Sequence, residues 1–222
     1  MRGGFSGPDQ LNVTQAYTLV ATGDVPGRHL GPQRFVNYGV AGAIFADLGI
    51  AGRIKVDLDR GDRVRVLSAE PTGDPVLDEV LQLVVDSPTQ RSVGAWVMQL
   101  GSSALRTRVL DSLVDDGLLE RRSSQVLGVV PAPRFREAGC RPEDDVVAAI
   151  RHALRGTERP DSVIACVIVL ADGTRVLKKV VDEVPQDAVD RIVSDVETAE
   201  VVRKIARVIR VMRVAMSASA TP

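Results

Sequence analysis

Residues 102–108 read SSALRTR, and this stretch has the residue types and spacing best suited to binding an anion. Ser102 or Ser103 can cap a helix that begins here, and a helix start presents free backbone N–H groups and a partial positive charge. A phosphate at that position is also within reach of the hydroxyls and of a guanidinium. We therefore predict a phosphate-binding site with Arg106 and Arg108 as the main contacts and Ser102 and Ser103 as weaker ones.

The alternative for Arg106 and Arg108 is a solvated basic face, paired with Asp111, Asp115 or a nearby carboxylate. Two arginines near an anionic surface supply about 2 kcal/mol, or roughly thirtyfold in affinity. That is too little to hold a protein on a membrane. Insertion of an apolar segment or avidity must add the rest.

Motifs of catalysis and metal binding are absent from the sequence. It holds no GxxxxGK loop, no GxSxG elbow, no HExxH and no paired CxxC. His29 lies in a Gly/Pro-rich stretch and His152 in a predicted helix, and neither has a plausible ligand set around it. We therefore expect no enzymatic activity, no metal and no cofactor.

The composition favours a single soluble domain. The chain has 222 residues, 45% of them hydrophobic, and 28 basic residues nearly balance 29 acidic ones. A near-neutral chain gives no global field for a polyanion, so no nucleic acid is expected as a partner. No apolar run reaches the roughly 18 residues of a membrane span, and the N-terminus lacks the apolar core of a signal peptide.

These features predict a cytoplasmic protein that is at most attached to the surface of a membrane. The cysteines, Cys140 and Cys166, are then reduced, and Cys166 lies in the apolar run VIACVIVL. The abundance of Ala, Val, Asp and Gly, with Arg favoured over Lys, indicates a bacterial source.

The elements that must position the anion site follow one another between residues 36 and 86. Val36, Val40, Ile44 and Leu48 lie on one helical face with small residues between them, as in a helix packed closely on several sides. A hairpin over residues 54–66 turns at residues 59–62, and Asp74 can cap a helix that begins at Pro75.

The rest of the chain is helical in pattern apart from a second hairpin, predicted over residues 118–130 with its tip near residues 121–124. The predicted fold is mainly α, a helical bundle decorated with two β-hairpins, and forms a single domain over residues 11–216 between flexible ends at residues 1–10 and 217–222. Further helices are expected at residues 11–21, 93–100, 102–116, 142–156, 162–172, 175–183, 186–195 and 197–216.

Two segments give the sequence a family resemblance. ADLGIAGRI at residues 46–54, followed by AEPTGDPVLDEVL at residues 69–81, resembles the signature of the Golgi phosphoprotein 3 family. This family comprises phosphatidylinositol-4-phosphate-binding adaptors, including yeast vacuolar sorting protein 74, and bacterial proteins of unknown role share its domain. The resemblance runs from Leu11 to the C-terminus and implies a helical fold, no catalysis and an anionic phospholipid head group as ligand.

The resemblance transfers to the anion site residue by residue. The phosphoinositide-binding relatives carry an RxxRxR pattern whose last two arginines match Arg106 and Arg108, while Ser103 stands at the first. A further arginine of their head-group pocket falls on Ala41, and their tryptophan falls near Pro32. Half of that pocket is thus replaced. An N-terminal arginine cluster that recruits vesicle-coat partners is also absent, so the protein client is unknown.

Two other surfaces bear on membrane contact. The apolar segment with Val126 and Leu127 resembles the relatives' hairpin, which is implicated in membrane contact and in self-association to a homo-oligomer; the alternative is a sheet face packed on the domain. The last helix places Arg203, Arg207 and Arg210 beside an apolar stripe. Because the relatives bury their final helix, we expect a core helix with a solvated basic face rather than a membrane-bound one.

Two other functions also fit the sequence. Residues 102–130 also fit the end of a winged helix-turn-helix, with Arg106, Arg108, Arg121 and Arg122 facing DNA. Acidic residues on the same helix and the neutral net charge count against it. The other rival is a soluble bacterial protein-interaction module that has lost lipid binding.

Overall fold

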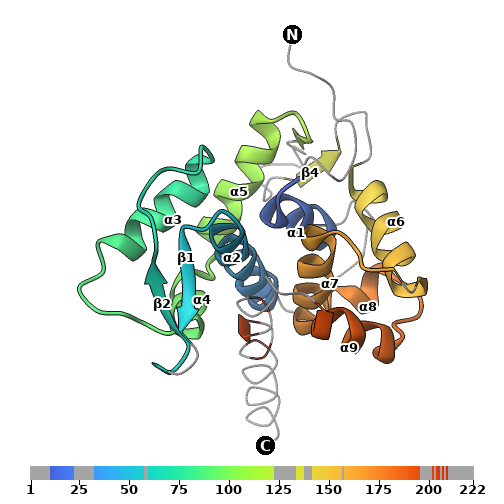
Figure 1. The fold of residues 1–222 in the computed structure, drawn as a ribbon. Coiled ribbons are helices and arrows are strands. Elements are labelled where there is room, and N and C mark those ends of the chain that lie inside the picture. Colours follow the sequence, from blue (N-terminus) through green and yellow to red (C-terminus); the bar gives the residue numbers. More distant parts are fainter. Residues whose placement is uncertain are drawn as a thin grey trace, which may run out of the picture.

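The computed structural model describes residues 11–22, 33–57, 60–122, 134–137, 142–156 and 158–195, together with positions 202, 204, 205, 207 and 209. Helix α2 (Gln33–Ile50) lies at the centre of the bundle (Figure 1). On one side of it are the hairpin of β1 (Ile54–Asp57) and β2 (Arg63–Val66) and the helices α3 (Pro75–Val85) and α4 (Val93–Leu100). On the other side are α1 (Val13–Thr22) and the helices of the C-terminal half (Figure 1). Residues 1–10, 123–133 and 217–222, with the predicted flexible ends and Val126 and Leu127, lie outside the described residues.

Helix α2 is buried on several sides because its small residues let other helices approach its backbone. A Cβ at Gly39 would lie 2.0 Å from the hydroxyl oxygen of Tyr17 on α1 (Val13–Thr22). A Cβ at Gly42 would lie 2.5 Å from Cγ2 of Ile205 in the last helix. The prediction of a closely packed central helix is confirmed.

The elements that follow α2 match the local sequence signals. Asp74 accepts hydrogen bonds from the backbone N–H groups of Val76 and Leu77, and Gly117 takes φ 75° where α5 stops. The hairpin turn holds Gly61 at φ 74°. The bounds are β1 (Ile54–Asp57), β2 (Arg63–Val66), α3 (Pro75–Val85), α4 (Val93–Leu100) and α5 (Ser103–Asp115).

The second strand pair differs from the predicted hairpin. Strand β3 (Leu119–Arg122) pairs antiparallel with β4 (Arg134–Glu137), with Leu119 opposite Glu137 and Arg122 opposite Arg134. The predicted partner within residues 126–130, and a tip near residues 121–124, were wrong. The prediction places the partner strand in an apolar run, whereas the segment that pairs with β3 is the more polar sequence RFRE. Backbone pairing over a long connection leaves little local signal.

The C-terminal half contains α6 (Pro142–Arg155), α7 (Ser162–Thr174), α8 (Leu177–Val180) and α9 (Gln186–Asp195). The predicted helix over residues 175–183 is a single turn, because Arg175 takes the left-handed conformation at φ 65° and Val181 is extended. In the last helix Val202, Ile205 and Ile209 are buried, which confirms the core interpretation at the described positions.

One core joins buried residues from Leu11 to Ile209, and the mainly helical fold with two antiparallel strand pairs is confirmed for the described residues. Trp96 is 3% exposed and lies against Phe45, so it belongs to the core. Cys166 is fully buried, and burial raises the pKa of its thiol to about 12. Cys140 lies outside the described residues.

The carboxylate of Asp47 joins α2 to the start of α1. It is 6% exposed and accepts hydrogen bonds from the backbone N–H groups of Val13 and Thr14, both at 2.8 Å, and from the Thr14 hydroxyl at 2.6 Å. The first N–H groups of a helix have no partner within the helix, so Asp47 completes the cap of α1 that Asn12 begins by accepting a hydrogen bond from Gln15 N–H at 2.8 Å. The two helices are thereby held in one register.

We expect Gly39→Ala to lower the free energy of unfolding by about 2 kcal/mol, because the added methyl overlaps the Tyr17 ring. Alanine itself favours a helix by roughly 1 kcal/mol, so a loss must come from the contact. Urea denaturation measures the change. Tyr17→Ala removes the ring and leaves room for the added methyl group. The double variant should therefore lose less unfolding free energy than the sum of the two single losses, and additive losses would contradict this explanation.

The stability of the fold should depend on the ionisation of Asp47. Burial raises the pKa of its carboxyl from 3.8 to about 6, against the lowering effect of its hydrogen bonds from Thr14 and Val13. The folded protein therefore binds this proton more tightly than the unfolded chain. The resulting stabilisation is complete below about pH 4 and is lost as the pH rises through about 6, which amounts to about 3 kcal/mol.

Urea unfolding of the wild type and of Asp47→Asn, at about pH 4 and about pH 7, isolates this group. From about pH 4 to about pH 7, the free energy of unfolding of the wild type should fall by about 3 kcal/mol more than that of the variant. A difference between the two proteins that does not change with pH would contradict the pKa assignment.

Candidate functional site

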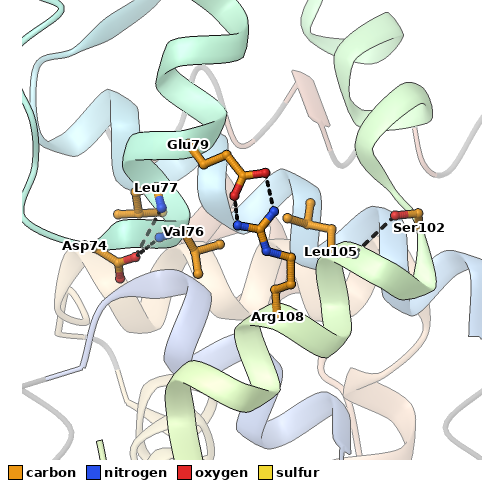
Figure 2. A network of polar contacts seen from close by, with 7 residues as sticks. All are labelled: Asp74, Val76, Leu77, Glu79, Ser102, Leu105 and Arg108. Atoms are coloured by element: carbon orange, nitrogen blue, oxygen red, sulfur yellow. Dashed lines mark hydrogen bonds and ion pairs between the residues drawn. The ribbon is translucent and has the colours of Figure 1, made fainter. Parts of the chain in front are cut away.

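The start of α5 is held by α5 itself and by α2. Ser102 caps the helix, and its hydroxyl accepts a hydrogen bond from Leu105 N–H at 3.2 Å (Figure 2). The side-chain amide of Asn37 is oriented with its oxygen towards α5, and this oxygen accepts a hydrogen bond from Ser103 N–H at 3.2 Å. Gly101, just before the cap, lies against the ring of Tyr38, where a Cβ would be 2.3 Å from Cδ1. Part of the predicted set of free N–H groups is therefore already bonded.

Arg106 lies one turn into α5 and is half-buried. Its Nε is fully buried and has no hydrogen-bond partner, and within the described part of the chain no carboxylate pairs with the guanidinium. Burial lowers the pKa of Arg106, and nearby Tyr17 opposes that effect. An arginine still remains charged at any physiological pH. A partly desolvated cation without a partner favours an anion supplied from outside.

Arg108 has a different environment. It is exposed, and its guanidinium forms a two-pronged ion pair with Glu79 of α3, in which both carboxylate oxygens face guanidinium nitrogens (Figure 2). Neither Asp111 nor Asp115, the carboxylates considered from the sequence, is this partner; Asp111 instead pairs with Arg121. To bind a phosphate, Arg108 must first leave Glu79.

The structure thus brings Ser102, Ser103 and Arg106 onto one face, because residues three and four positions apart are neighbours on a helix. Arg108 points to α3 instead. Sequence reasoning missed Asn37 and Tyr38, which α2 brings to the α5 start. Both lie far from α5 in the chain, and no motif links them to it. Ser103 itself is exposed and open to a ligand.

Metal ligands and membrane spans were sought among the described residues. Among them no group of His, Cys, Asp and Glu side chains is arranged to hold a metal ion. His152 is exposed on α6, and His29 lies outside the described range. Within the same range, no helix has the length and apolar character needed to cross a membrane.

The family model of Golgi phosphoprotein 3 (GPP34) matches residues 14–211, which is most of the chain. The chain belongs to the Golgi phosphoprotein 3 family. A search of the curated proteins finds no match. The family assignment accounts for the bundle on both sides of α2, whereas a winged helix would explain only α5 and the strands after it. Arg121, one of the side chains proposed to face DNA, is paired with Asp111.

Within the Golgi phosphoprotein 3 family pattern, the replaced pocket positions have clear environments. Ala41, which the resemblance matches to an arginine of the relatives, is 1% exposed on α2 and belongs to the core. Ser103 is exposed at the first position of their arginine pattern. Pro32 lies outside the described residues. Of the two arginines predicted for the site, Arg108 is paired with Glu79, and Arg106 has no carboxylate partner among the described residues.

We expect Ser102→Ala to lower the free energy of unfolding by about 1 kcal/mol, because Leu105 N–H loses its acceptor. Ser103→Ala is the matched control, since its exposed hydroxyl makes no such bond, and should change stability by less than about 0.5 kcal/mol. Thermal and urea unfolding measure both. Equal losses would show that Ser102 does not act as the cap.

Proposed function

We propose that this member of the Golgi phosphoprotein 3 family is a non-catalytic peripheral membrane protein that binds anionic phospholipid head groups at the start of α5. The observation that carries the proposal is the half-buried Arg106 guanidinium, whose Nε has no partner. A phosphate there gains a charge-assisted hydrogen bond and supplies the missing counter-charge. The exposed Ser103 hydroxyl on the same face is a second donor.

The head group we propose is phosphatidylinositol 4-phosphate or a closely related phosphorylated lipid, following the family. With Ala41 and Ser103 at two pocket positions, the site has fewer charges with which to distinguish phosphorylated head groups. We therefore expect selectivity among anionic lipids to be weak. Arg108 is a secondary contact, because binding through it requires breaking its ion pair with Glu79.

One or two arginines near an anionic surface give only about 1 kcal/mol each, so the protein needs another source of affinity. We propose that Val126 and Leu127 provide it, by entering the membrane or by joining copies of the chain into an oligomer whose sites act together. Such a protein works on the cytoplasmic face of a membrane, where it serves as an adaptor for a client still to be identified.

The test is flotation with vesicles of phosphatidylcholine alone, or with added phosphatidylinositol or phosphatidylinositol 4-phosphate. The wild type should float with the anionic vesicles, and the double variant Arg106→Glu, Arg108→Glu should not. Arg106→Gln should lose at least about tenfold in affinity, because it removes a charge-assisted contact from a desolvated position. Arg108→Gln, the matched arginine control on the same helix, should lose less than about threefold.

Glu79→Gln tests for a gain of function. It removes the carboxylate that pairs with Arg108, so vesicle binding should become stronger. Circular dichroism and unfolding of each variant exclude misfolding as the cause of a loss. Equal losses for Arg106→Gln and Arg108→Gln would remove the special role of Arg106. Failure of the folded wild type to bind any vesicle would contradict lipid binding and favour the protein-interaction module.

A further inference from the structure

The outer edge of β2 is only partly paired. Leu67 N–H donates to the Arg53 carbonyl at 2.8 Å, and in an antiparallel pair alternate residues face the partner strand, so Arg65 and Arg63 also face β1. The backbone groups of Val64 and Val66 therefore point away from β1. Strand β2 lies on the outside of this sheet (Figure 1).

This edge is closed at one end by the segment before α4. Val64 N–H donates to the Arg91 carbonyl, and Val93 N–H donates to the Asp62 carbonyl, both at 2.9 Å. Beyond this bridge the two segments diverge. Among the described residues, the Val64 carbonyl and both backbone groups of Val66 have no hydrogen-bond partner.

A pocket of about 250 Å³ lies where the two segments separate. Its walls combine apolar side chains of β2, α3 and α4 with polar side chains of β2 and of the segment before α4: Val64, Arg65, Val66, Val84, Val85, Ser87, Thr89, Gln90, Arg91 and Trp96. This is below the roughly 300 Å³ of a typical small-molecule site. It is large enough for a side chain from a segment lying along the strand. Binding by strand addition uses both features. Unpaired backbone groups at a sheet edge form hydrogen bonds with the added strand, and a neighbouring pocket takes one of its side chains.

Exposed positive charges gather around the edge, and the nearby carboxylates of Asp57 and Asp62 are paired with Arg60 and Lys204. Lys55, Arg63 and Arg65 are exposed on the outer face of the hairpin, and Arg91 is exposed where its guanidinium lies 5.4 Å from the centre of the Trp96 ring. In the described part of the chain none of these side chains pairs with a carboxylate. The protein as a whole has a net charge of −1, so this is a local concentration of positive charge.

The positive charge around this edge indicates which kind of partner can bind there. A second copy adding its own β2 would bring Arg63 and Arg65 against the same residues, and like charges across a strand pair are destabilising. A strand with acidic side chains instead places them beside these cations. We propose that the outer edge of β2 binds an extended acidic peptide segment of another protein by strand addition, with apolar side chains of that segment entering the pocket beside Trp96.

The test uses a fluorescein-labelled hexapeptide of alternating glutamate and valine, and fluorescence anisotropy with the full-length protein. In an added strand only alternate N–H groups face β2. N-methylation of one alternate set should therefore abolish binding, and N-methylation of the other set should leave it within about twofold. The same peptide with lysine in place of glutamate should not bind.

Variants of the protein separate backbone pairing from charge. Val66→Pro removes an outward N–H without touching the pairing with β1, and should weaken binding about fivefold. Arg65→Glu should weaken it at least about tenfold, while Lys179→Glu on α8, an exposed cation far from this edge, should leave it unchanged. Unfolding measurements on each variant show whether the fold is retained.

Equal binding of both N-methylated peptides, or an unchanged affinity for Val66→Pro, would overturn strand addition, because attraction between charges alone would then explain the binding. The proposal would also be overturned if the peptide did not bind while duplex DNA or phosphatidylserine vesicles bound in a way that Arg65→Glu abolished. In that case the basic face would serve a different class of partner.

Discussion

The close approach of other helices to the backbone of α2 is the constraint on which the rest of the fold depends. Tyr17 lies over Gly39 and Ile205 over Gly42, at separations that leave no room for a β-carbon. Within this packed surface the Asp47 carboxylate caps α1 through hydrogen bonds to Val13 and Thr14. A buried polar group must find partners, so this contact permits a single register of α1 on α2. The N-terminal end of α2 then brings Asn37 and Tyr38 to the start of α5.

What distinguishes Arg106 from the other cations of the site is the absence of a partner in the described structure. Arg108 is bound to Glu79, Arg121 to Asp111, and Lys204 of the last helix to Asp62 at 2.9 Å. Such surface pairs contribute little to stability, but they occupy the cations that take part in them. A half-buried guanidinium without a partner is less stable than one that is solvated or paired. An anion bound to this guanidinium would supply the missing partner. We propose that this anion is the head group of a membrane lipid.

The sequence predicted those parts of the fold whose signals are local. Asp74 with Pro75, Ser102 and Gly117 mark helix ends through their own backbone chemistry, and the structure places helix ends there. Strand β4 was not predicted, because its pairing with β3 depends on a segment distant in sequence. The truncation of α8 depends on the left-handed backbone of Arg175, an unusual conformation for a non-glycine residue. For the site, the helix start at Ser102 could be predicted from the sequence, but the ion pair of Arg108 with Glu79 could not, because that partner comes from another helix.

The most direct test of the central claim follows the arginine Nε–H signals by nuclear magnetic resonance during titration with a soluble, short-chain phosphatidylinositol 4-phosphate. We predict that the Nε–H signal of Arg106 shifts saturably, because a phosphate bound to the exposed part of this half-buried guanidinium changes the environment of the buried nitrogen. The signal of Arg108 should move less while its ion pair with Glu79 persists. An Arg106 signal that stays in place while the signals of other arginines shift would contradict the assignment of the site.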